Sequence, residues 1–118
     1  MNNYDGDYWG HNGPNLLTRL FRRECKTFIT EMPLTCSNFT MLQREKCYAI
    51  DWREWQKFFN IADAADVMNK VKDSYFVHFW NHLNADKKLS KLKDANTAYM
   101  KLAEKFCPEV VAAPDDFF

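Results

Sequence analysis

Residues 74–80 constrain the fold of this 118-residue chain more than any other segment. The run Ser74–Trp80 is dense in aromatic and β-branched residues, which is typical of a β-strand. In a strand, odd- and even-numbered side chains would project from opposite faces. The odd set is Tyr75, Val77 and Phe79, and the even set is Phe76, His78 and Trp80. A single strand is not stable without partners. The segment therefore predicts a sheet that this chain does not supply in full, and the chain is expected to be a fragment of a larger fold.

Helical patterns dominate the rest of the chain. Pro14 suits the first position of a helix, and apolar residues at helical spacing predict a helix from Pro14 to about Cys25. Asp51 is a good N-cap for a second helix. That helix would carry Trp52, Trp55, Phe58 and Phe59 along one face. Further helices are predicted over Ala62–Lys72 and Leu89–Phe106, the last ended by Pro108. The expected fold class is α/β and helix-rich.

The remaining segments are expected to be irregular. Residues 1–13 read as a loop, and residues 26–46 form a long excursion without a sustained period. A short strand is predicted over Cys47–Ile50 and a polar loop over Asn81–Asp86. Residues 110–118 are expected to be a poorly ordered tail, which leaves residues 1–109 as the structured region.

Composition excludes several classes of function. Sixteen basic residues face sixteen acidic ones, so the chain lacks the basic footprint of a nucleic-acid-binding domain. No run approaches the about 18 consecutive apolar residues that a membrane-spanning helix needs. The first residues also lack the apolar core of a signal peptide. If the protein enters the secretory pathway, its targeting segment is expected to lie outside this chain.

The four cysteines fit no C-x2-C zinc pattern, and they are Cys25, Cys36, Cys47 and Cys107. They are compatible with reduced thiols in the cytosol or with disulfides in an oxidising compartment. Cys25 and Cys36 bracket the first half of the irregular excursion, where a covalent link would fit. Asn38-Phe39-Thr40 is an N-glycosylation sequon, which favours the oxidising compartment.

Asp5-Gly6-Asp7 is a D-x-D sequence, a pattern that holds a divalent cation in many sugar-nucleotide transferases. Such a pair normally follows a buried apolar strand that aims both carboxylates. Residues 1–4 are polar, so the Asp and Gly residues predict a solvated turn instead.

The sequence Trp9–Pro14 is the stronger candidate for ligand binding. Glycines allow the backbone to approach a ligand closely, and the start of the following helix offers free N–H groups to an anion such as phosphate. His11 and Asn12 add polar groups beside Gly13. The competing interpretation is a tight turn before a helix.

A second candidate lies at the C-terminal end of the aromatic segment. His78, followed by Asn81 and His82, forms a polar group where α/β sheets place ligands. His78 could ligate a metal, bond a phosphate or pack in the core. The aromatic stripe beginning at Trp52 is interpreted as core rather than a sugar-stacking surface, and the three arginines of the first helix as a solvated face. Those arginines are Arg19, Arg22 and Arg23.

Four blocks of the chain resemble the conserved region of the α1,4-glycosyltransferase family. They are WGHNGPNLLTRLFRREC (residues 9–25), CYAIDWREWQKFF (47–59), DSYFVHFWNHL (73–83) and KFCPEV (105–110). The resemblance covers about residues 4–109, nearly the whole chain. Several blocks in one order form a specific signal, unlike any single motif above.

The resemblance implies the C-terminal portion of a GT-A-type fold, with one or two strands completing a sheet mostly absent from this chain. It implies a type II Golgi membrane glycoprotein, anchored by a segment outside this chain. The enzyme would use a UDP-sugar and Mn²⁺, and would transfer a hexose or N-acetylhexosamine in α1,4 linkage with retention. The acceptor would be a galactose-type sugar on a glycolipid or glycoprotein, as in glycosphingolipid biosynthesis.

Site residues follow from the same resemblance. His11, Asn12 and Gly13 would line the sugar or diphosphate pocket, while His78 and Asn81 would contact diphosphate or metal. The family's D-x-D lies upstream of this region, so the metal role is not assigned to Asp5 and Asp7. His82 stands where family members carry Lys, and Cys47–Trp52 lacks the two prolines of the corresponding family block.

The resemblance also implies a disulfide between Cys25 and Cys36, because both match cysteines of the family. Cys107 is the main competing partner, and Cys47 has no counterpart in the family blocks and is expected to be free.

Three functions remain open on the sequence. The first is the C-terminal part of an α1,4-glycosyltransferase, inactive in isolation. The second is a truncated, non-catalytic lumenal module of the same fold. The third is a small cytosolic helical binding domain, which predicts no disulfide and no glycan at Asn38.

Overall fold

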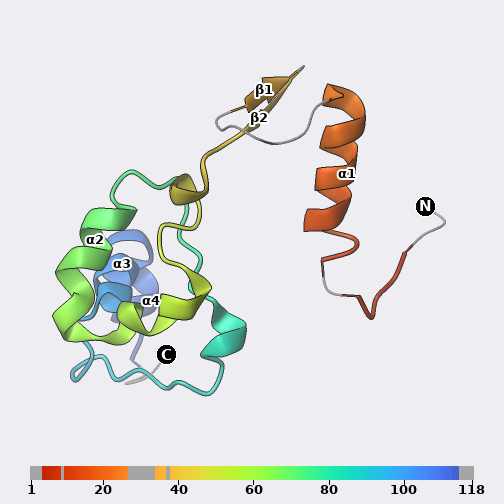
Figure 1. Ribbon diagram of the computed structural model, residues 1–118. Coiled ribbons are helices and arrows are strands. Elements are labelled where there is room, and N and C mark those ends of the chain that lie inside the picture. Colours follow the sequence, from red (N-terminus) through yellow and green to blue (C-terminus); the bar gives the residue numbers. More distant parts are fainter. Residues whose placement is uncertain (1–3, 9, 27–33, 37, 115–118) are drawn as a thin grey trace. The chain divides into compact units, whose positions relative to one another are not determined.

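The computed structural model describes residues 4–8, 10–26, 34–36 and 38–114. These residues divide into two compact units, residues 1–43 and residues 44–118 (Figure 1). Within the described ranges, no helix is both long and apolar enough to cross a membrane.

The helix predicted from Pro14 to Cys25 is confirmed as α1 (Pro14–Cys25). Proline occupies its first turn, and Gly10, at φ 79°, reverses the chain just before it. Glycine is suited to this left-handed conformation because it has no Cβ. Lys26 closes the helix at φ 49°, donating its N–H to the carbonyl of Arg22. Phe21 is the buried residue of α1.

A two-stranded antiparallel hairpin lies within the segment predicted to be irregular. It consists of β1 (Leu34–Cys36) and β2 (Phe39–Met41), with Thr35 opposite Thr40. Strands of three residues are too short to produce a measurable alternation, which explains why the pattern did not predict them. Residues 27–33 of the same segment lie outside the described residues.

A disulfide links Cys25 to Cys36, with the two Cα atoms 5.7 Å apart. The predicted pairing is therefore present in the structure. It joins the last residue of α1 to the last residue of β1, within the first unit. The other two cysteines, Cys47 and Cys107, are free.

The second unit contains the main hydrophobic core. Three helices contact one another there: η2 (Trp52–Phe59, a 3-10 helix), α2 (Ala64–Val71) and α3 (Ala98–Phe106) (Figure 1). The side chains buried between them are Ile50, Phe58, Ala64, Val67, Val71, Ala98 and Leu102.

The helix predicted to begin at Asp51 exists in 3-10 form. The Asp51 carboxylate accepts a hydrogen bond from the N–H of Arg53 at 2.9 Å, so the predicted N-cap is confirmed. The aromatic stripe enters the core at Phe58, which is 0% exposed, whereas Trp52 remains 48% exposed. The short strand predicted over Cys47–Ile50 is wrong, because these residues form a turn and bends.

The long helix predicted over Leu89–Phe106 is wrong in its first half, since α3 begins only at Ala98. Thr97 sets this boundary: its hydroxyl donates to the carbonyl of Asp94 at 2.7 Å and accepts from the N–H of Met100 at 3.3 Å. Leu92, which belonged to the predicted apolar stripe, is 90% exposed.

The observed bounds of three other segments also differ from the predicted ones. The helix predicted over Ala62–Lys72 is a 3-10 turn, η3 (Ile61–Asp63), leading into α2. A further helix, α4 (Pro108–Ala112), follows α3, so Pro108 both ends one helix and starts the next. Part of the segment expected to be a disordered tail is therefore helical, and residues 115–118 lie outside the described residues. In the predicted loop Asn81–Asp86, residues 81–83 form the short helix η4 (Asn81–Leu83).

Residues 74–80 do not form a strand in this structure. Their side chains follow the predicted alternation only in part. Val77 and Phe79 of the odd set pack against the core, but so does Trp80 of the even set, and Tyr75 is 74% exposed. Phe76, His78 and Trp80 all meet the ring of Tyr48, at centroid distances of 5.9, 5.6 and 5.6 Å. The segment therefore shows part of the side-chain pattern of a strand, without a neighbouring strand to pair with among the described residues.

Candidate functional site

Asp5 organises the turn that precedes α1. Its Oδ1 accepts hydrogen bonds from the N–H groups of Asp7 at 3.0 Å and Tyr8 at 3.2 Å. This is the arrangement by which Asp side chains stabilise turns. Both carboxylates of the D-x-D sequence are exposed, so the interpretation as a solvated turn is confirmed.

The side chain of Asn12 holds the same loop closed. Its Nδ2 donates to the carbonyl of Asp5 at 2.6 Å, and its Oδ1 accepts from the N–H of Asp5 at 3.3 Å. Asn12, predicted as a ligand contact, therefore has a structural role. At Gly13, a Cβ would meet nothing within 4 Å, so the surface above this residue is open.

His11 lies in an open pocket of about 400 Å³ beside α1. The residues lining this pocket are Tyr8, His11, Asn15, Thr18, Arg19 and Arg22. The Nη2 of Arg19 donates to the carbonyl of His11 at 3.2 Å, which ties the loop to the helix. The rings of Tyr8 and His11 meet edge to face at 5.9 Å.

His78 belongs to an aromatic cluster in the second unit. Its ring packs on Trp80 at a centroid distance of 4.2 Å, but the residue is exposed and is not part of the core. Its Nδ1 accepts a hydrogen bond from the N–H of Trp80 at 3.0 Å. Because Nδ1 is the acceptor, the proton of the neutral ring lies on Nε2, which is then a hydrogen-bond donor. A donor suits a phosphate or hydroxyl oxygen, whereas a metal would require a lone pair at that atom.

Asn81 follows closely, as the first residue of η4. Trp80 precedes it in a left-handed conformation, φ 56°, which turns the chain sharply between His78 and Asn81. Asn81 and His82 are both exposed. The structure thus places the predicted residues of the second unit on one short, accessible stretch. His11, Asn12 and Gly13 belong to the first unit.

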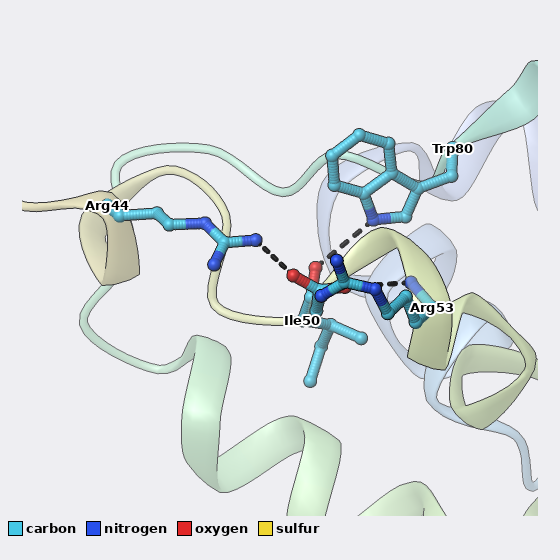
Figure 2. A network of polar contacts seen from close by, with 5 residues as sticks. Arg44, Ile50, Arg53 and Trp80 are labelled. Atoms are coloured by element: carbon cyan, nitrogen blue, oxygen red, sulfur yellow. Dashed lines mark hydrogen bonds and ion pairs between the residues drawn. The ribbon is translucent and has the colours of Figure 1, made fainter.

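A charged network lies beside this stretch. Arg44 and Arg53 both form ion pairs with Asp51, while the indole Nε1 of Trp80 donates to the carbonyl of Ile50 at 3.1 Å (Figure 2). The hydrogen bond from Arg44, followed by that from the backbone N–H of Arg53, holds the pKa of the Asp51 carboxyl below its usual range. The same hydrogen bond raises the pKa of Arg44.

The described residues do not fit a Mn²⁺ site. No three His, Cys, Asp or Glu side chains among them come together in a way that could hold a metal ion. The Oδ1 of Asp5 already accepts a hydrogen bond from the backbone N–H of Asp7. The Nδ1 of His78 accepts from the N–H of Trp80, which leaves Nε2 as a hydrogen-bond donor.

The sequon asparagine lies on the hairpin. Asn38 is an exposed turn residue immediately before β2, and Thr40 of the sequon is also exposed. An exposed turn is accessible to glycosylation.

Two features of these surfaces were not predicted from the sequence. The residues at positions 15, 18, 19 and 22 follow the spacing of one helix face, which could have indicated that Arg19 and Arg22 share a pocket with His11. The contact of Tyr48 with the even-numbered aromatic residues had no local signal, because it joins segments about thirty residues apart.

Comparison with known proteins assigns the class. Residues 1–114 match the family model described as "Alpha 1,4-glycosyltransferase conserved region". It belongs to the α1,4-glycosyltransferase family.

Two relatives illustrate the likeness. The chain is 33% identical over 110 residues to human alpha-1,4-N-acetylglucosaminyltransferase, covering 92% of this chain and 31% of that protein. It is 34% identical over 106 residues to mouse lactosylceramide 4-alpha-galactosyltransferase, covering 90% of this chain and 29% of that protein. The chain thus spans about a third of the length of these relatives. No solved structure matches it significantly.

Proposed function

We propose that this chain is the C-terminal part of a retaining α1,4-glycosyltransferase of the Golgi lumen. The complete enzyme would transfer a hexose or N-acetylhexosamine from a UDP-sugar to a galactose-type acceptor on a glycolipid or glycoprotein. The observation that carries this proposal is the family match over residues 1–114, which includes both candidate ligand-binding stretches. The names of the relatives, which include a lactosylceramide 4-alpha-galactosyltransferase, support a glycolipid acceptor.

The GT-A-type fold is supported by the aromatic segment. None of the backbone N–H groups from Phe76 to Phe79 donates a hydrogen bond within the described part of the chain. The side chains alternate in part as in a strand, and the large exposed residues Tyr75 and Phe76 border an apolar pocket of about 430 Å³. A run of backbone N–H groups without acceptors, beside apolar surface, is what a strand presents when its sheet is supplied from elsewhere.

Each candidate residue has a definite task in this proposal. The Nε2–H of His78 would donate to an oxygen of the donor diphosphate, and Asn81 would add an amide nearby. His11 and the open surface above Gly13 would face the donor, while Asn12 keeps their loop in shape.

The test is to extend the transcript upstream and to assay the resulting protein against the 118-residue chain. Both receive Mn²⁺ and labelled UDP-galactose, UDP-N-acetylgalactosamine or UDP-N-acetylglucosamine with lactosylceramide. We expect α1,4 transfer by the extended protein and none by the shorter chain. Transfer by the 118-residue chain would show that it is not an incomplete enzyme. An extended protein that folds but transfers no sugar would support a non-catalytic module instead.

A further inference from the structure

We propose that Asn38 receives an N-linked oligosaccharide only while the Cys25–Cys36 disulfide is still open, so that folding of the first unit and modification of the protein compete. The inference goes beyond the proposed function and takes from it only the lumenal location of the chain. Asn38 begins the one N-x-Ser/Thr sequon of the sequence, so any N-linked glycan on the chain lies at this position.

The first step is the place of the sequon in the hairpin. Asn38 lies in the turn that precedes β2, and the other two sequon residues, Phe39 and Thr40, belong to β2. In the antiparallel register, Phe39 pairs with Cys36 and Thr40 pairs with Thr35. Cys36 also forms the disulfide. The covalent link is therefore made by the strand that pairs with the sequon.

The second step is the state of the sequon hydroxyl. The Oγ1 atoms of Thr40 and Thr35 lie 3.1 Å apart and form a hydrogen bond across the two strands. N-glycosylation requires Ser or Thr at this position, because the transferase binds the hydroxyl while the acceptor segment is extended in its site. In the closed hairpin the sequon is bent and its hydroxyl is engaged. The closed hairpin is therefore a poor substrate, although its exposed turn leaves room for a glycan that is already attached.

The third step is what keeps the hairpin closed. β1 and β2 have three residues each, and a two-stranded hairpin alone is at best marginally stable. Such a hairpin forms within about 1–10 μs, whereas a disulfide takes seconds or longer, so transfer has time to precede the covalent link. The disulfide then ties β1 to the end of α1, and β2 and α1 together line an apolar groove of about 370 Å³.

The reaction balances with one co-substrate, an oligosaccharide carried on a lipid diphosphate. The Nδ2 of Asn38 bonds to C1 of the oligosaccharide, the bond from C1 to the phosphate oxygen breaks, and the proton lost by the amide leaves with the lipid diphosphate. A chain modified first can still form the disulfide. A chain that forms the disulfide first stays unmodified.

The experiment follows newly made protein in cells. The 118-residue chain is expressed behind a cleavable signal peptide and labelled with a short pulse, and its mass is compared before and after enzymatic removal of N-linked glycans. Cys25→Ser abolishes the disulfide without changing any residue of the hairpin, and Cys36→Ser abolishes it from within β1. Cys47→Ser removes a free cysteine and is the matched control. Because all newly made chain is counted, a variant that does not fold still reports its glycan.

We expect partial modification of the unaltered chain. Cys25→Ser and Cys36→Ser should each raise the ratio of glycosylated to unglycosylated chain by about 3-fold or more, because closing of the hairpin then stays reversible on the microsecond scale. Cys47→Ser should change this ratio less than about 1.5-fold, since it leaves the slow, lasting step in place.

An absence of glycan from all four proteins, or an equal ratio in all of them, would overturn the inference. So would a rise in Cys36→Ser alone, because that substitution changes the sequence beside the sequon and Cys25→Ser does not. These outcomes are separate from failure of the proposed function, since the added signal peptide delivers the chain to the lumen in every case. Sugar transfer by the extended protein, with a glycan that does not respond to the disulfide, would leave the enzyme in place and remove only the competition.

Discussion

At the scale of single residues, the carboxylate of Asp51 combines a helix cap with an ion pair: it caps η2 and pairs with Arg44 from the preceding segment. A carboxyl whose pKa is lower in the folded than in the unfolded state stabilises the fold above the unfolded value, about 3.9. That contribution is lost as the pH falls through the lowered folded pKa.

Replacing Arg44 with Gln should therefore raise the pKa of Asp51 toward its ordinary value, since the largest cause of the shift is removed. The variant should lose stability relative to the native chain at neutral pH, and this difference should shrink as the solution becomes acidic. Carbon-detected NMR titration of the Asp51 carboxyl measures the shift. Arg53→Gln is the control: the cap comes from the backbone N–H of residue 53, so its effect should be smaller. An equal rise of the Asp51 pKa in both variants would contradict the conclusion that the hydrogen bond from Arg44 is the largest cause of the shift.

His78 gives the second prediction at this scale, tested in the extended protein. Its exposed ring offers Nε2–H, so His78→Ala should lower kcat or weaken UDP-sugar binding by about 10- to 100-fold with the melting temperature nearly unchanged. His78→Gln should recover part of the activity because its amide can also donate. Thermal midpoint and activity are measured on the same preparations. Normal activity per folded molecule, with a clear drop in melting temperature, would leave His78 as a packing residue.

At the scale of elements, the start of α3 depends on one hydroxyl. Thr97 is fully buried, and its Oγ1 both accepts from the N–H of Met100 and donates to the carbonyl of Asp94. Thr97→Val keeps the shape but removes the cap, and should lower the free energy of unfolding by about 1–2 kcal/mol. Thr97→Ser keeps the hydroxyl and should retain most of the free energy of unfolding. Urea unfolding followed by tryptophan fluorescence measures the free energy of unfolding of both variants. Equal losses of stability in Thr97→Val and Thr97→Ser would show that the hydroxyl cap is not what stabilises the start of α3.

At the scale of the whole molecule, the backbone N–H groups of residues 76–79, which donate no hydrogen bond within the described residues, test whether a longer protein supplies a neighbouring strand. In the 118-residue chain these amides should exchange with solvent nearly freely. In the extended protein at least two alternate amides should be protected by about 100-fold or more, because a neighbouring strand accepts their hydrogens. Hydrogen exchange resolved by residue measures this, with the α3 amide of Leu102 as an internal reference. Equally fast exchange in both proteins would show that the segment is not part of a sheet.

The sequence by itself determined those features whose cause is local. Proline at the first turn and regular apolar spacing predicted both ends of α1. An acidic side chain before an aromatic run predicted the N-cap at Asp51. The sequence also predicted part of the side-chain alternation of residues 74–80, because alternation depends only on the order of residues along an extended chain. The cysteine pair came from family resemblance, and the structure contains it.

Tertiary structure decided what depends on distant partners. The three-residue strands of the hairpin exist through mutual pairing. The helix α3 begins at Ala98 because the buried hydroxyl of Thr97 caps it there, although the apolar pattern begins at Leu89. Residues 74–80 have part of the side-chain order of a strand, but the N–H groups of residues 76–79 donate no hydrogen bond within the described residues. A β-strand is stabilised by hydrogen bonds to a neighbouring strand. A local sequence pattern can therefore predict which side chains share a face, but not whether the strand forms.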